Sequence, residues 1–65
     1  MNAKEVDMYL MSVAAFIMRV ESLNEREAFN LIRENRVKER LKMVPSLADH
    51  CSPKQCAEML LTNRG

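Results

Sequence analysis

Three side chains near the end of the chain have types that can do chemistry: His50, Cys51 and Cys56. Imidazole and thiolate groups bind zinc, and a thiol beside an imidazole can act as a nucleophile. Their spacing matches no zinc ribbon or finger, however, and adjacent ligands such as His50 and Cys51 rarely both reach one ion, even with Asp49 nearby. No further residue is evident that would orient the imidazole or build an oxyanion site. We therefore predict no metal, no cofactor and no enzymatic activity.

The two cysteines have a simpler interpretation as packing residues. Cys51 precedes a predicted helix start and Cys56 follows it, which are the two apolar positions of a hydrophobic staple. Free thiols are typical of a reducing compartment, and no signal peptide is apparent, so we expect a cytoplasmic protein. A redox role for Cys51 and Cys56 stays open, because a cysteine at a helix N-terminus can have a lowered pKa and the pair could form a disulfide.

The elements that must position these residues are indicated by a pattern that occurs three times. Each copy reads apolar, Asn or Ser, two spacers, Glu or Gln, apolar, which is a capping box within a hydrophobic staple. The polar pair satisfies N–H groups that a helix start leaves without partners. The three copies are Met1–Val6, Leu23–Ala28 and Cys51–Cys56.

The periodicity that follows each cap predicts an all-α protein. We expect helices over Ala3–Val20, Glu25–Glu34 and Val37–Met43, and a last helix that opens at Ser52 with Pro53 in its first turn. Pro45–His50 should form a turn or one short helical turn. Asn35 should end the second helix in the left-handed conformation. The fold class is a compact bundle of three to four short helices forming one domain, 1–65, with the first helix central.

Each predicted helix has a face that should turn toward the core. In the first helix this stripe has the spacing of a core-facing surface. The predicted inward residues are Val6, Tyr9, Leu10, Val13, Phe16, Ile17 and Val20, then Ala28, Phe29, Leu31 and Ile32, then Val37, Leu41 and Val44, and finally Cys56, Met59 and Leu60 with Ala57 and Leu61 beside them.

A second apolar strip flanks the core stripe of the first helix: Met8, Met11, Ala15 and Met18. A chain of 65 residues has little material to cover both surfaces, and small domains often depend on an oligomer for stability. Flexible, polarizable methionine is also common on adaptable partner surfaces. We therefore predict that this strip is the interface with a partner, either a second copy in a homodimer or a larger protein.

A basic segment, 33–42, supports an alternative. It contains Arg33, Arg36, Lys38, Arg40 and Lys42, which could follow the phosphates of a nucleic acid. The formal net charge of the whole chain is only +1, so no global field would attract nucleic acid or an anionic membrane. Apolar runs are too short to span a bilayer, so we expect no membrane contact. The single glycine, Gly65, excludes a phosphate-binding loop of the usual glycine-rich kind.

The first helix, the segment Leu23–Ile32 and Leu47-Ala48-Asp49-His50 together resemble a bacterial family of very short helical proteins catalogued as a domain of unknown function. Its members have an apolar first helix, a capped second helix of the Glu-Ala-Phe-x-Leu-Ile kind and a Leu-x-x-His near a third. The segment around Pro45 and the Cys51/Cys56 pair depart from that pattern. The resemblance implies a small accessory protein, sometimes encoded beside toxin-like ADP-ribosyltransferases, and therefore an antitoxin-like role.

These observations predict a non-enzymatic protein–protein interaction module or small regulator that associates through its apolar first helix. The alternative is a small nucleic-acid-binding regulator that uses the basic segment.

Overall fold

The longest helix, α1 (Ala3–Glu21), begins at the first predicted cap. In the computed structural model, which describes residues 2–63, the Glu5 N–H donates to Asn2 Oδ1 at 2.8 Å, and the Asn2 N–H donates to Glu5 Oε1 at 3.4 Å. Both halves of the capping box are therefore formed. Met1, the predicted staple partner of Val6, lies outside the described residues.

Helices α2 (Glu25–Glu34) and α5 (Pro53–Asn63) begin in the same way. At α2 the Glu27 N–H donates to Asn24 Oδ1 at 2.8 Å, and the Glu27 carboxylate accepts from the Asn24 N–H at 3.2 Å. At α5 the Gln55 N–H donates to Ser52 Oγ at 3.3 Å, and the Gln55 amide oxygen accepts from the Ser52 N–H at 3.0 Å. All three predicted helix starts are confirmed.

The two shorter helices are α3 (Val37–Met43) and α4 (Leu47–His50). Helix α4 is the short helical turn expected after Pro45, so residues 2–63 form five helices where three to four were predicted. The same part of the chain contains no β-strand. The all-α fold class is therefore confirmed.

The prediction that Asn35 adopts the left-handed conformation is wrong. Its φ is −93°, whereas Arg36 has a φ of 54°. The backbone N–H of Asn35 still donates to the Leu31 carbonyl at 3.2 Å, and its side-chain amide donates to the same oxygen at 2.8 Å. These two bonds hold Asn35 on the helix, so the left-handed residue comes one position later, at Arg36, between α2 and α3.

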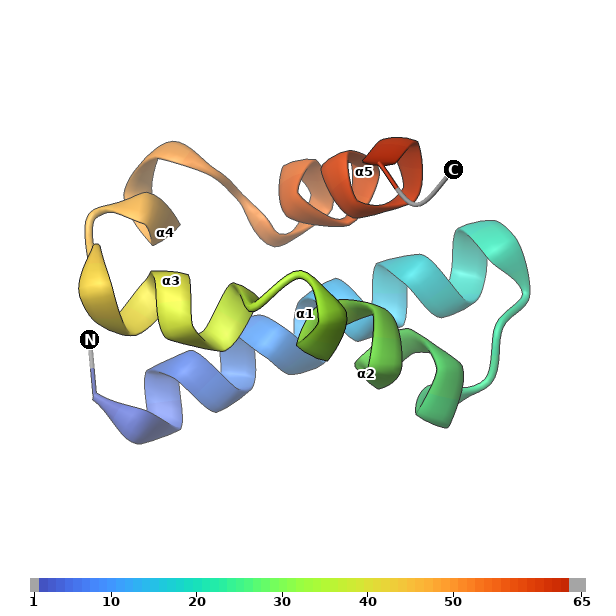
Figure 1. Ribbon diagram of the computed structural model, residues 1–65, viewed down its shortest axis with the longest axis horizontal. Coiled ribbons are helices and arrows are strands. Elements are labelled where there is room, and N and C mark those ends of the chain that lie inside the picture. The colour runs from blue at the N-terminus through green and yellow to red at the C-terminus, as the bar shows by residue number, and fades with distance from the viewer. Residues whose placement is uncertain (1, 64–65) are drawn as a thin grey trace.

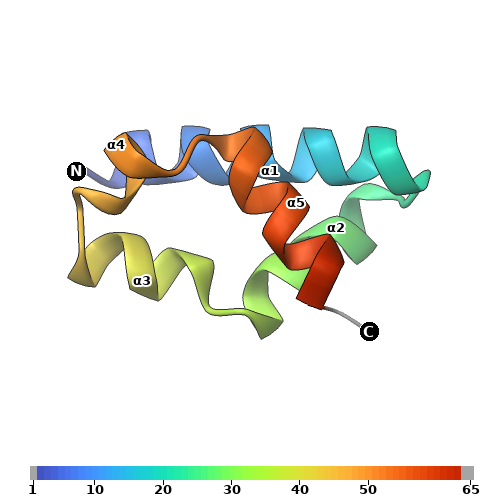
Figure 2. The same ribbon diagram turned by 90° about the horizontal axis from the view of Figure 1, so that it is seen from above.

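Helix α1 is the common packing partner of the bundle. It packs against α5, α2 and α3, as predicted for a central first helix, while α3 also contacts α2 and α4. Figure 2 shows α1 along one long edge of the molecule, with α2 and α3 together on one side of it. In Figure 1, α4 and α5 lie above the other helices. One long face of α1 is therefore left without a neighbour among the described helices.

The core contains most of the predicted inward residues, with Val13, Ile17, Ala28 and Leu41 fully buried. Phe16, Phe29 and Leu61 are half-buried against it. Three predictions are wrong: Val20, Val44 and Met59 are exposed, while Ala14, which was not predicted, is buried. The buried face of α1 is therefore rotated toward Ala14 and away from Val20. Periodicity predicts the apolar stripe, but the position of the covering helices decides which edge of the stripe is buried.

Candidate functional site

The predicted partner strip of α1 lies on the uncovered side of that helix. Met8 is 60% exposed and Met11 is 63% exposed, and Ala15 is also exposed. Met18 differs, because its side chain is half-buried and packs against the core. At about 100° per residue, all four positions fall within one quarter of the helix circumference, facing away from the buried stripe. The strip is therefore a continuous apolar surface in contact with solvent.

A second feature, built around Tyr9, joins α1 to the segment before α5. The Tyr9 hydroxyl donates a 2.6 Å hydrogen bond to the backbone carbonyl of Cys51, 42 residues further along the chain. The ring of Tyr9 belongs to the core and only 8% of the residue is exposed. A buried tyrosine needs a partner for its hydroxyl, and here the partner is the carbonyl immediately before the α5 cap. This bond fixes the entry of α5 against α1.

The thiols of Cys51 and Cys56 lie beside this hydroxyl. Both cysteines are free; Cys56 is buried and Cys51 is half-buried. Burial raises the pKa of Cys56 above its ordinary value of 9.0, the neighbouring Cys51 raises it further, and Tyr9 and Arg40 oppose the shift. Burial also raises the pKa of Tyr9, reinforced by the two nearby thiols. The expectation of a lowered pKa at this helix N-terminus is therefore wrong for Cys56, because desolvation dominates.

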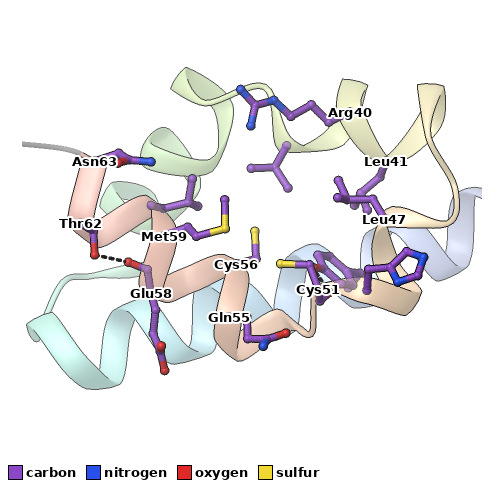
Figure 3. A pocket seen from close by; sticks show the side chains of 14 residues that line it. Arg40, Leu41, Leu47, Cys51, Gln55, Cys56, Glu58, Met59, Thr62 and Asn63 are labelled. Atoms are coloured by element: carbon purple, nitrogen blue, oxygen red, sulfur yellow. Dashed lines mark hydrogen bonds between the residues drawn. The ribbon is translucent and has the colours of Figure 1, made fainter.

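Both cysteines line an open cavity of about 710 Å³ between α5 and the α3–α4 segment. Figure 3 shows Cys51 and Cys56 side by side in its wall, with Leu41 and Leu47 nearby and Arg40 on the α3 side. The cavity exists because α5 packs on α1 and makes at most slight contact with α3. Met59 was predicted to face the core; its side chain faces this cavity instead and stays half exposed.

The Cys56 thiol is not activated in this cavity, because burial raises its pKa. His50 lines the cavity together with the two cysteines, as the sequence suggested. A thiol with a raised pKa remains protonated near neutral pH and is a weak nucleophile. Within residues 2–63, no group of three or more His, Cys, Asp or Glu side chains is arranged to hold a metal ion.

The basic segment is divided by the structure. All five basic side chains are exposed, but they do not form one face. Arg33 belongs to α2, and the left-handed Arg36 separates it from α3. On α3, Lys38 and Lys42 are four positions apart and share a side, whereas Arg40 lies on another side and lines the cavity. The segment therefore offers short basic patches instead of a continuous track for phosphates.

Two features of this region were not predicted from the sequence. The bond between Tyr9 and the Cys51 carbonyl links distant segments, and its only sequence signal is a tyrosine within a core-facing stripe. The cavity depends on how far α5 stands from α3, which no local pattern describes.

None of the helices within residues 2–63 combines the length and apolar character needed to cross a bilayer. Comparison with models of protein families, with curated proteins and with solved structures finds no match. The resemblance to a bacterial family of very short helical proteins therefore stays a prediction.

Proposed function

We propose that this protein is a non-enzymatic interaction module, of the small regulator or antitoxin-like kind, whose binding surface is the Met8/Met11/Ala15/Met18 strip of α1. The observation that carries the proposal is the exposure of Met8 and Met11 on the helix face opposite the core. Scattered exposed apolar residues are normal in small proteins, but a continuous strip on one helix face is typical of an association surface.

The energy available from this strip suits a reversible interaction. Fully burying a methionine side chain contributes about 1.5–3 kcal/mol. Since Met8 and Met11 each keep about 60% of their exposure, each has about 1–2 kcal/mol still to gain on binding. Association costs several kcal/mol in lost translational and rotational freedom. We therefore expect micromolar or weaker affinity unless contacts beyond the methionines contribute.

The substitution Met11→Glu tests this surface. It places a charge in the middle of the strip on a residue that is 63% exposed, so the fold should survive while association is lost. We expect unchanged helix content by circular dichroism. Self-association in sedimentation equilibrium, or binding of a partner captured from the native host by the wild-type chain, should fall at least about tenfold, the effect of about 1.4 kcal/mol.

Met43→Glu is the matched control. Met43 is 82% exposed at the end of α3, outside the strip, so the same change of chemistry should leave association intact. Equal association by wild type, Met11→Glu and Met43→Glu would count against the α1 strip as the binding surface.

A further inference from the structure

The spacing of the α1 strip suggests what covers it. Met8, Met11, Ala15 and Met18 follow one another at intervals of three, four and three residues. This is the spacing of the two seam positions of a coiled coil, where apolar side chains of one helix pack between those of a second. The strip therefore matches the surface of another long helix better than a flat or globular surface.

The sizes of the apolar side chains along the strip favour pairing with a second copy of α1 that runs in the antiparallel direction. With the twofold axis near Val13, Met8 of one copy lies opposite Met18 of the other, and Met11 lies opposite Ala15. Each large side chain at the centre then faces a small one. In a parallel pair Ala15 would face its own copy and leave a gap beside Met11. The antiparallel pair also opposes the two helix dipoles.

Charge along the edge of the strip favours the same arrangement. Glu5, Ser12 and Arg19 are exposed and seven residues apart, so they form one row beside the seam. The row is acidic at the helix start, neutral in the middle and basic at the end. Antiparallel pairing brings Glu5 of each copy next to Arg19 of the other, twice in the dimer. The row on the other edge contains Asp7, Ala14 and Glu21, of which only Ala14 is buried. Its two acidic residues are exposed and carry the same charge, so this edge opposes the pairing and the attraction comes from the Glu5–Arg19 edge alone.

We infer that the partner of this surface is a second copy of the chain, bound through α1 as an antiparallel, twofold-symmetric dimer with Glu5–Arg19 contacts at both ends. The inference rests on the proposed function, because it uses the same strip. Such an interface is self-complementary, as twofold symmetry requires. It closes on itself, so assembly stops at the dimer.

A charge exchange tests the pairing. Glu5→Arg alone brings two basic groups together at each end of the dimer, and Arg19→Glu alone brings two acidic groups together there. Each variant alone should dimerise about tenfold more weakly than wild type in sedimentation equilibrium, as expected for two lost and reversed surface ion pairs. In an equimolar mixture the heterodimer pairs opposite charges at both of its ends, so native mass spectrometry should show heterodimers well above the statistical proportion.

The mixture is its own control. Glu5→Arg also removes the carboxylate that accepts from the Asn2 N–H, but this loss within the chain is the same in the homodimer and the heterodimer. A parallel pair would also favour the heterodimer, because it would set residue 5 against 5 and residue 19 against 19. In that arrangement, however, like charges already meet in wild type and neither variant alone would weaken the dimer, so the antiparallel pairing requires both the weakened single variants and the favoured heterodimer.

The outcomes separate this inference from the proposed function. A statistical mixture, with association still sensitive to Met11→Glu, would overturn the antiparallel pairing and leave the interaction surface standing. A wild-type chain that stays monomeric at millimolar concentration, yet binds a host protein through Met11, would also overturn the homodimer alone. If Met11→Glu leaves association unchanged, both the antiparallel dimer and the proposed binding surface are overturned.

Discussion

At the scale of single residues, the most consequential contact is between Tyr9 and the segment before α5. Its hydroxyl bonds the Cys51 carbonyl at 2.6 Å and lies beside two thiols. Burial raises the pKa values of Tyr9 and Cys56, which therefore stay protonated and uncharged at neutral pH, the form that a poorly solvated site favours. The cluster therefore packs α1 against the segment that leads into α5.

The raised pKa values of Cys56 and Tyr9 predict that stability falls in alkaline solution. Unfolding lets each group lose its proton at its ordinary pKa, 9.0 for Cys56 and 10.0 for Tyr9, while the folded state retains it. The stability is thus fully present below these values and is lost as pH rises above them, by up to about 1.4 kcal/mol per pH unit for each group. Urea unfolding from about pH 7 to about pH 10.5 measures this loss on both sides of the two ordinary pKa values.

The variant Cys56→Ala isolates one of the two groups. Truncating a buried side chain lowers stability at every pH, so the slope and not the height of the curve is compared. The stability of Cys56→Ala should begin to decline near the ordinary pKa of Tyr9, whereas that of wild type should begin to decline near the ordinary pKa of Cys56. The interacting groups Cys51, Tyr9 and Arg40 are unchanged in this variant. If the curves of stability against pH for wild type and Cys56→Ala are parallel, Cys56 does not contribute to the alkaline loss of stability.

At the scale of the helices, local hydrogen bonds between side chain and backbone decide where α1, α2 and α5 begin. The caps of α1, α2 and α5 each satisfy two N–H groups with side chains three residues apart. Helix α4 begins without this help: Ser46 precedes it but makes no side-chain bond to its first turn. The three capped starts are therefore set by sequence, whereas α4 depends on the turn around Pro45.

The two serines offer a matched test of capping. Ser52→Ala removes the Oγ that accepts from the Gln55 N–H at 3.3 Å, so we expect a loss of about 1 kcal/mol of unfolding free energy. Ser46→Ala makes the same chemical change at the start of α4 and should stay within about 0.5 kcal/mol of wild type. Urea unfolding at one protein concentration measures both. A loss at Ser46 as large as that at Ser52 would show that helix propensity, not the cap, is responsible.

At the scale of the whole molecule, one apolar core is shared by α1, α2, α3 and α5. Leu41 of α3 and Ile17 of α1 are fully buried in it, although α3 is only seven residues long. On the opposite face of α1, the strip stays open to solvent. The bundle thus covers one side of its longest helix and leaves Met8 and Met11 on the other side exposed.

Because the core is small, one truncation should remove most of its stability. Leu41→Ala deletes a side chain with no exposed surface and is expected to cost about 2–5 kcal/mol. Chains of this length seldom have more than about 3–5 kcal/mol in total. We therefore expect Leu41→Ala to be largely unfolded by circular dichroism.

Met43→Ala is the control for this truncation. It lies two residues along the same helix at an 82% exposed position, so it should change stability by less than about 0.5 kcal/mol. A cooperative unfolding transition of Leu41→Ala at wild-type urea concentrations would contradict this account of the core.

Local patterns in the chain were sufficient to predict the helices and their starts, because a cap and a periodic apolar face act over a few turns. They also indicated an apolar strip on α1, of which Met8, Met11 and Ala15 are exposed whereas Met18 is half-buried against the core. The predictions failed where a distant segment decides the outcome. Val20, Val44 and Met59 carry apolar side chains at helical spacing, but no other helix within residues 2–63 buries them.

From its residues alone, then, this chain determines its caps, its helix lengths and the apolar strip at Met8, Met11, Ala15 and Met18, since each depends on neighbours within a few turns. Only the tertiary structure decides the rotation of α1, the raised pKa of Cys56 and the bond from Tyr9 to Cys51. Each of these depends on which helix comes to lie against α1. Contacts across 42 residues leave no periodic trace in the sequence.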